Sequence, residues 1–496
     1  MKSTKQTLCI TQLSLPLLLA GTSVSCTQQT ENTQPNVIFI LADDLGYGDI
    51  SCNGQTMIET PNIDKLASQG MRFTQHYSGS TVSAPSRSSL LTGLHTGHTP
   101  VRGNRELKNA EGQFPLPAAT FTMPEMFQQA GYATGAFGKW GLGFPGSEGD
   151  PNMQGIEEFF GYNCQRQAHR YYPLHVWHNQ EKFILEGNDF TNKVIYAPDV
   201  IHERSLEYIT ANAKANKPFF AYLALVQPHA ELLAPEDELL EKYRGIFKEE
   251  TPYVAKKPGA NYGDADFDLM QYSSQAEPHA TFAAMVSRVD RYVGDVLNLL
   301  DELGIADNTI VIFSSDNGAH LEGGADPDFF NSNGSVTGYK RDLTEGGIRT
   351  PMFVRWNGKI KANSTSDHLS AFWDVMPTMA EIIGREPLEQ TDGISMLNEW
   401  IGKKQQTHDY LYWEFTAGKG EMAVRIGDWK IIRTRLNKTE NGDFLVYNLK
   451  NDPKEQNNLA AQQPEIVAQA LEIMKREHVP NKDYLFGYER ANEKKK

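Results

Sequence analysis

Two apolar runs that end in pairs of oxygen-bearing side chains set the strongest constraint on the fold of this chain. The run NVIFILADD ends in Asp43 and Asp44, and the run NTIVIFSSDN ends in Asp316 and Asn317. Both are short and apolar, which is typical of a strand buried on both faces. Because ligand sites of open parallel sheets form outside the carboxyl ends of the strands, we expect both pairs to emerge at the same edge of one sheet.

Helical patterns alternate with such runs along most of the chain. TPNIDKLASQG predicts a helix with Thr60 as its cap and Pro61 in its first position, and residues 281–303 carry apolar side chains at helical spacing. This alternation predicts an α/β fold: a large, mostly parallel sheet flanked by helices, over residues 35–385.

The pattern changes after about residue 385. GEMAVRIGDWKIIRTRL and DFLVYNLKND are typical of antiparallel strands, and PEIVAQALEIMKREH is typical of one amphipathic helix. We therefore expect residues 386–496 to form a smaller C-terminal α+β subdomain with an antiparallel sheet.

The first 26 residues have the pattern of an export signal. A basic start with Lys2 and Lys5 precedes the apolar run LSLPLLLAG and small residues before Cys26. The same pattern suits a bacterial lipoprotein with a lipid on Cys26, although leucine is commoner than serine three residues before that cysteine, so both alternatives stay open. Residues 27–34 would then be a tether. From this signal pattern we expect an exported protein, periplasmic or lipid-anchored to the bacterial envelope. No later run is long and apolar enough to span a bilayer.

The net charge bears on the class of binding partner, and the cysteines bear on disulfide and metal binding. The net charge is −15, and −17 without the signal segment, which argues against nucleic acid or an anionic membrane surface as a partner. Cys9 and Cys26 lie in the signal region, whereas Cys52 and Cys164 could equally pair or remain free thiols, and no metal-ligand spacing links them.

The two polar pairs predict a metal site. Three carboxylates and one amide, without histidine or cysteine, suit calcium or magnesium better than zinc, and the larger, more flexible shell of calcium suits them best. One such pair alone would more commonly be a solvated turn at a strand end.

An anionic ligand in this acidic protein would need cationic side chains, and Lys139 and Lys340 lie next to predicted strands, where loops meet the sheet. Lys139 follows the predicted strand in YATGAFGK, and Lys340 lies in TGYKRDLTEGGIRTP before the predicted strand PMFVRW. His229 follows the apolar run FFAYLALVQP, where an imidazole near the sheet edge could exchange a proton near neutral pH. Each of these residues alone would more often be simply solvated or structural.

The segment SAPSRSSLLTG, residues 83–93, adds Ser83 and Arg87. On its own it is most simply a helix start, with Ser83 as the N-cap and Gly93 as the stop. The segment also fits a signature of cysteine or serine, any residue, proline, any residue, arginine, then a leucine-rich turn ending in threonine-glycine. Together with PNIDKLASQG, GKWGLG, PHAEL, SSDNG, EGGIRTP and GDWK, it makes nearly the whole mature chain resemble a formylglycine-dependent sulfatase, of the serine type, in the alkaline phosphatase superfamily.

This resemblance implies roles for the residues above. Ser83 would be oxidised to formylglycine (3-oxoalanine) by a sulfatase-maturating enzyme, and one hydroxyl of the hydrated aldehyde would attack sulfur. Arg87 would hold that hydrate, Lys139 and Lys340 would bind sulfate oxygens, and His229 would protonate the leaving sugar oxygen. The calcium ligands would be Asp43, Asp44, Asp316 and Asn317.

One motif departs from the family pattern. Many members have GKWHLG where this chain has GKWGLG, with Gly141 in place of the histidine. His320, in SDNGAHLEGG, is a candidate to compensate and to contact the substrate.

The substrate class follows from residues 161–179. GYNCQRQAHRYYPLHVWHN packs aromatic, histidine and arginine residues into a predicted loop, the composition of a surface that binds a sugar, although a partly buried hairpin with aromatic core residues is an equal alternative. His169 and Arg170 are our candidates for substrate contact. We expect a sulfated glycan, with a galacto-configured sugar, as the substrate.

Two alternatives remain at the level of sequence. A phosphatase, phosphodiesterase or phosphonate hydrolase of the same superfamily would use an unmodified Ser83, but its two-zinc members need more histidines around the site. A catalytically silent lipoprotein that binds sulfated glycans would have no need of the full set of cations and metal ligands.

Overall fold

A computed structural model describes residues 1, 34–107, 111–248, 250–258, 269–385 and 388–495. Residues 2–33, which include most of the predicted signal segment, Cys26 and most of the tether, lie outside the described residues. Residues 386 and 387, at the predicted domain boundary, lie outside them as well. Within the described ranges, no helix is long and apolar enough to cross a membrane. Cys52 and Cys164 are free thiols.

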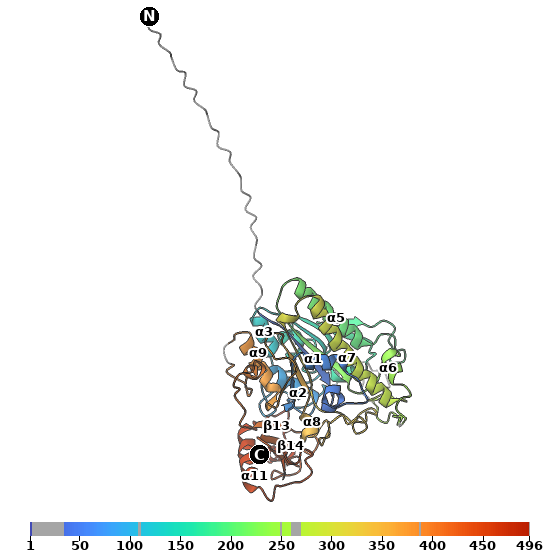
Figure 1. The fold of residues 1–496 in the computed structure, drawn as a ribbon. Helices are drawn as coiled ribbons and strands as arrows, with labels where there is room; N and C mark the ends of the chain where they lie inside the picture. The colour runs from blue at the N-terminus through green and yellow to red at the C-terminus, as the bar shows by residue number, and fades with distance from the viewer. Residues whose placement is uncertain (2–33, 108–110, 249, 259–268, 386–387, 496) are drawn as a thin grey trace.

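A ten-stranded sheet forms the centre of the molecule (Figure 1). Its strands, in spatial order, are β11 (Ser364–Ser366), β2 (Met71–Phe73), β10 (Met352–Arg355), β9 (Thr309–Ser315), β1 (Asn36–Asp43), β8 (Phe219–Pro228), β4 (Ala133–Lys139), β5 (Glu158–Tyr162), β6 (His175–His178) and β7 (Glu181–Ile184). The five central strands, β9 to β5, run parallel, whereas β10, β6 and β7 pair antiparallel to their neighbours. The predicted α/β class with a mostly parallel sheet is confirmed.

Helices cover both faces of this sheet (Figure 1). Ile38 and Ile40 of β1 pack into a core with α1 (Pro61–Ser68), α5 (Ala197–Lys214) and α7 (Pro278–Glu302). Val37 and Phe39 point to the other face and pack with α2 (Ser83–Thr92), α3 (Met123–Gln129) and α9 (Val375–Ile382). Because alternate side chains of a strand point to opposite faces, the unbroken apolar run of β1 is what a strand between two helical layers requires. The remaining short elements are α4 (Gln165–Ala168), α6 (Glu238–Tyr243), α8 (Glu345–Ile348), α10 (Leu397–Trp400), and the paired β3 (His76–Tyr77) and β12 (Ser370–Ala371).

A separate antiparallel sheet forms the C-terminal part, as predicted. Its strands are β13 (Leu411–Phe415), β14 (Glu421–Ile426), β15 (Trp429–Thr434) and β16 (Asp443–Asn448), followed by α11 (Pro464–Glu477) and α12 (Gly487–Glu493). One face of this sheet packs on α11, and the other packs Trp413 and Ile432 against Tyr77 and Trp373 of the larger body. The small sheet is thereby attached to β3, which precedes α2 in the chain, and to the turn before α9.

The N-terminus of α1 is held from a distant helix rather than by the predicted cap. Thr60 stands at the N-cap position, but its side chain makes no capping hydrogen bond. Instead the carboxylate of Asp290, in α7, accepts hydrogen bonds from the backbone N–H groups of Asn62 and Ile63 at 2.9 and 2.8 Å. Periodicity along α1 carries no information about this partner, which lies 228 residues from Asn62.

We expect Asp290→Ala to lower the free energy of unfolding by about 2 kcal/mol, because two N–H groups at a helix start lose their acceptor. Denaturant unfolding measures this change. Asp295→Ala is the control in the same helix: its carboxylate is 42% exposed and pairs with His202, so a loss of about 0–1 kcal/mol is expected. Equal losses in the two variants would contradict the capping role of Asp290.

Candidate functional site

The carboxyl ends of β1 and β9 bring the two predicted polar pairs together. The backbone N–H of Asp44 donates to Oδ1 of Asp316 at 3.1 Å, and Nδ2 of Asn317 donates to Oδ1 of Asp44 at 2.6 Å. All four side chains, Asp43 included, are fully buried. Asp44 has a φ of 61°, the left-handed region that non-glycine residues rarely adopt, so the backbone is strained where its carboxylate turns into the site.

This cluster fits a hard cation. Oδ1 of Asn317 is buried and has no hydrogen-bond partner among the described residues, whereas Oδ2 of Asp43 pairs with Nζ of Lys139. Ligand atoms of Asp43, Asp44 and His229 lie within 4.8 Å of one another. A buried amide oxygen without a donor is costly unless a cation or water satisfies it, and carboxylate and amide oxygens are the ligands calcium prefers.

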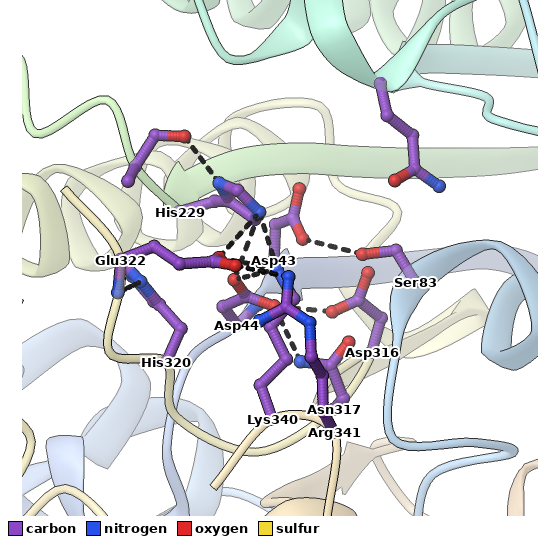
Figure 2. A network of polar contacts seen from close by, with 12 residues as sticks. Asp43, Asp44, Ser83, His229, Asp316, Asn317, His320, Glu322, Lys340 and Arg341 are labelled. Carbon is purple, nitrogen blue, oxygen red and sulfur yellow. Dashed lines mark hydrogen bonds and ion pairs between the residues drawn. The ribbon is translucent and has the colours of Figure 1, made fainter. Parts of the chain in front are cut away.

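Ser83 begins α2 but does not cap it. Val82 occupies the N-cap position and Ser83 is the first helical residue, so the interpretation of Ser83 as the N-cap is wrong. Its Oγ donates to Oδ1 of Asp43 at 3.1 Å and accepts from Nζ of Lys139 at 3.1 Å, as Figure 2 shows for the aspartate. Ser83 is fully buried, so its hydroxyl faces the carboxylate cluster and not solvent.

Arg87, one turn further along α2, ties that helix to β9 and β4. Its Nε and Nη2 donate to Oδ2 of Asp316 at 3.1 and 2.9 Å, and its Nη1 donates to the carbonyl of Lys139 at 2.7 Å. The side chain is fully buried. Arg87 therefore fixes the first turn of α2, and with it Ser83, against the strand ends.

Lys340 and His229 form the other side of the site. Nζ of Lys340 donates to Oδ2 of Asp44 at 2.8 Å and to Nε2 of His229 at 2.7 Å. The imidazole Nδ1 faces the carbonyl of Ala230. An imidazole that accepts from an ammonium at Nε2 and donates at Nδ1 is neutral, so the proton between these two residues is on Lys340.

Burial and neighbouring charges shift the pKa values of these groups. Burial, and then the charge of Lys340, hold the pKa of His229 well below its usual value. Burial also lowers the pKa of the Lys139 ammonium, although Asp43 opposes the shift. The pKa of Asp316 is raised by burial and by Asp43, while Arg87 acts in the opposite direction. By formal charge alone, the three carboxylates, Asp43, Asp44 and Asp316, balance the three cationic side chains, Arg87, Lys139 and Lys340.

Glu322 and Arg341 complete the network, and the sequence analysis missed both. Oε2 of Glu322 accepts from Nζ of Lys340 at 3.0 Å and lies 3.7 Å from Nε2 of His229, and its other oxygen pairs with Arg341 (Figure 2). Burial alone would raise the pKa of Glu322, but the charges of Lys340 and Arg341 hold it well below its usual value. The side chain of Arg341 is 54% exposed, so it leads from the buried site to solvent. In the sequence, Glu322 and Arg341 were marked only by their places near His320 and Lys340, respectively.

His320, the residue predicted to compensate for the missing histidine, lies against His229 and is held by backbone groups. Its Nε2 faces the carbonyl of Pro228 at 3.2 Å and its Nδ1 accepts from the N–H of Glu322 at 3.2 Å, so both nitrogens are engaged. Its ring stacks on His229, with centroids 5.4 Å apart. Gly141 has a φ of 75°, and a Cβ there would meet Nε2 of Gln165 at 3.4 Å, so Gln165 bounds that side instead.

Of the two predicted substrate residues, His169 contacts His229, whereas Arg170 is held by other partners. His169 stacks on the His229 ring at 4.0 Å between centroids, and its buried Nε2 has no hydrogen-bond partner among the described residues. Arg170 is buried, pairs with Glu231 and donates to the carbonyl of Met270 at 2.7 Å. Both residues line a cavity of about 270 Å³ together with Glu106, Arg166, Pro258, Gln271 and Tyr272. The segment 161–179 contains α4 and β6, and β6 forms an antiparallel hairpin with β7, so of the two alternatives that the composition left open this part fits the hairpin and not the loop.

Comparisons with known proteins agree with this geometry. A family model described as sulfatase matches residues 35–384, and one described as N-sulphoglucosamine sulphohydrolase, C-terminal, matches residues 338–479. The chain is 30% identical to an N-acetylgalactosamine-6-O-sulfatase of Bacteroides thetaiotaomicron, over 90% of this chain and 93% of that protein. It is 29% identical to the N-acetylgalactosamine-6-sulfatase of Homo sapiens, over 80% and 71% of the two chains. The crystal structure of Ps i-CgsB in complex with k-i-k-neocarrahexaose superposes with a TM-score of 0.72 at 25% identity, over 90% of this chain and 94% of the other.

Proposed function

The chain belongs to the sulfatase family and hydrolyses sulfate esters of carbohydrates, and from that premise we propose that it does so with a formylglycine made from Ser83 and a bound Ca²⁺. The proposed substrate is a 6-sulfated, galacto-configured sugar such as N-acetylgalactosamine. The observation that carries the proposal is the position of Ser83 Oγ, 3.1 Å from both Asp43 and Lys139 at the edge of a buried oxygen cluster.

Ser83 needs modification to serve as the nucleophile. A serine hydroxyl is a weak nucleophile near neutral pH, whereas a hydrated aldehyde supplies one hydroxyl to attack sulfur and a second to expel sulfate afterwards. In this chain Lys139 and Asp43 orient the oxygen at position 83 from two sides. Arg87 holds the helix turn in place through Asp316 and the carbonyl of Lys139. The modification itself is supported by the match of residues 83–93 to the serine-type signature.

Asp43, Asp44, Asp316 and Asn317 would hold the calcium ion. When bound, the ion lowers the pKa of a neighbouring hydroxyl and offsets the charge of sulfate oxygens. The cluster of three carboxylates and three cations is already balanced. The two charges of calcium therefore match one negative charge on a sulfate monoester and one on a deprotonated nucleophile. This match supports a divalent ion over a monovalent one.

Lys340 and His229 would deliver the proton to the leaving sugar oxygen. Because the imidazole is neutral and accepts from Lys340 at 2.7 Å, the pair stores its proton on the lysine. An alkoxide leaves poorly, so a proton donor at this point lowers the barrier to bond cleavage. Glu322 and Asp44 keep the lysine charged until the substrate arrives.

The sugar would enter through the cavity beside His169. His169 and Tyr272 offer ring surfaces there, and Arg166 and Glu106 offer charged groups at the cavity wall. Arg341 lies half-exposed at the site and can donate to a sugar hydroxyl. The preference for a 6-sulfate rests on the names of the relatives and is part of the proposal.

We propose that the protein works outside the cytoplasm, as its first 26 residues predict, with lipid attachment at Cys26 left as an alternative to simple export. A maturating enzyme that modifies Ser83 would act on the chain before it folds, since the folded chain buries this residue completely.

One paired experiment tests the proposal. Protein made in a host that matures serine-type sulfatases is digested, and the mass of the peptide containing Ser83 is measured by mass spectrometry. The same preparation is assayed for sulfate release from N-acetylgalactosamine that carries sulfate on oxygen 6 or on oxygen 4. We expect a mass deficit of two hydrogens at Ser83 and faster release from the 6-sulfated sugar.

Phosphate esters of the same sugar serve as the control substrates. Unmodified Ser83 in fully active protein, or faster release of phosphate than of sulfate, would refute the formylglycine proposal and favour the phosphatase alternative. Modified protein that binds sulfated sugars without turnover would instead favour the binding role. A preference for the 4-sulfate would refute only the proposed position.

A further inference from the structure

We propose that Glu455, in the C-terminal part of the chain, is a positioning residue that holds Lys340 in the candidate site. Oε2 of Glu455 accepts a hydrogen bond from the backbone N–H of Glu345 at 2.7 Å. Glu345 is the first residue of α8, which follows Lys340 closely in the chain and lies next to the C-terminal sheet in Figure 1. The inference rests on the proposed function in one respect, that Lys340 acts on the substrate.

Lys340 belongs to a strained loop, residues 337–346. The N–H of Gly346 donates to the carbonyl of Thr337 at 2.7 Å, which closes the loop. Arg341, next to the lysine, has a φ of 82°, in the left-handed region that non-glycine residues rarely adopt. Such backbone persists only where the surrounding structure holds it firmly. The partners of this loop therefore decide where the ammonium group of Lys340 lies.

The C-terminal part holds this loop at both of its ends. At the first end, the hydroxyl of Thr337 donates to the carbonyl of Lys454 at 2.5 Å. At the second end, Glu455 accepts from the N–H of Glu345, and Nζ of Lys430 donates to the Glu345 carboxylate at 3.1 Å. Because Lys430 belongs to β15 and Glu455 follows β16, two segments of the C-terminal part reach the loop.

Glu455 is itself buried and held in a strained conformation. The residue is 6% exposed, its φ is 51°, and its Oε1 has no hydrogen-bond partner among the described residues. Burial raises the pKa of Glu455 to about 8, although the charge of Lys430 opposes the shift. Near neutral pH the carboxyl is therefore mostly uncharged, and its contribution is that of a hydrogen-bond acceptor for the start of α8.

A small displacement of Lys340 would slow the reaction. Its Nζ lies 2.7 Å from Nε2 of His229, 2.8 Å from Oδ2 of Asp44 and 3.0 Å from Oε2 of Glu322. All three contacts require one position of the ammonium group, and a shift of about 1 Å at a reacting group can lower a rate by about 100-fold. Through this loop, the C-terminal part influences a residue of the site.

The test compares Glu455→Ala with Glu455→Gln in the full mature chain. The two readouts are backbone hydrogen exchange in peptides covering residues 337–346, measured by mass spectrometry, and kcat/KM for the sulfated sugar. In Glu455→Ala we expect exchange in the loop to be about tenfold faster and kcat/KM to fall on the order of 10–100-fold. Glu455→Gln keeps an uncharged acceptor oxygen, so both values should stay within about twofold of the unaltered chain.

Two further variants guard against a general loss of stability. Thr337→Ala removes only the contact with Lys454 from an exposed position, and exchange in the loop should be about threefold faster. Asp290→Ala is the matched control, because it also removes a carboxylate that holds a helix start, but at α1. It should lower stability and leave both exchange in the loop and kcat/KM unchanged.

The proposal is overturned if exchange in the loop is unchanged in both Glu455→Ala and Thr337→Ala. It is also overturned if exchange is faster in Glu455→Ala while kcat/KM stays the same. Lys340→Ala, assayed in parallel, shows a failure of the proposed function separately. Full turnover in that variant would refute the role of Lys340 and, with it, any effect of Glu455 on the reaction, whereas the exchange data would still show whether Glu455 holds the loop.

Discussion

Replacing Ser83 with alanine is expected to lower turnover of sulfated sugar by on the order of 10⁴-fold or more, because the chain loses the oxygen that, in the proposed mechanism, maturation converts into the nucleophile. The fold should persist. Lys139 and Asp43 remain paired with each other when the hydroxyl is gone, so the loss of one shared hydrogen-bonding group should cost about 1 kcal/mol. Sulfate release and denaturant unfolding measure the two effects separately.

Ser89→Ala provides the matched control for that variant. Ser89 lies in the same helix, is equally buried, and its hydroxyl has no hydrogen-bond partner among the described residues. Its removal should change neither turnover nor stability appreciably. If Ser83→Ala kept turnover within about tenfold of the unaltered chain, position 83 would not carry the nucleophile.

The sequence predicted most of the fold because the fold depends on local patterns. The apolar run of β1, the helical spacing of α7 and the alternating strands β14 and β15 each carry their own periodicity, and the structure has an element at each place. The position of the carboxylate and amide cluster also follows from a general rule, since parallel strands end at one edge and their terminal residues meet there.

Contacts between distant segments were not predictable in this way. Thr60 and Ser83 both look like helix caps in sequence, yet Asp290 holds the start of α1 and Asp43 takes the hydroxyl of Ser83. Glu322 gave no signal beyond its place near His320, because its importance comes from Lys340, 18 residues further along the chain, which the fold brings within hydrogen-bonding distance. Composition could not decide between a loop and a partly buried hairpin at 161–179, because the choice depends on the pairing of β6 with β5 and β7.

The carboxylate of Asp316 serves two purposes: it is a ligand of the proposed calcium site, and it pairs with the buried Arg87. We expect Asp316→Asn to weaken calcium binding by on the order of 100-fold and to lower turnover by a similar factor or more, since one charged ligand is lost. The free energy of unfolding should fall by about 3–5 kcal/mol, because the fully buried Arg87 then keeps only Asp43, at 4.0 Å, as an acidic partner.

The matched control for this prediction lies near the other end of the same strand. Asp307 precedes β9 and accepts one exposed hydrogen bond, from Asn357 at 3.0 Å, so Asp307→Asn should leave calcium affinity, turnover and stability nearly unchanged. Calorimetric calcium titration and unfolding, each with and without calcium, separate the two expected losses. An Asp316→Asn variant that unfolds more easily but binds calcium and turns over like the unaltered chain would mean that Asp316 serves only to pair with Arg87. In that case the cation would have to be held by Asp43, Asp44 and Asn317 alone.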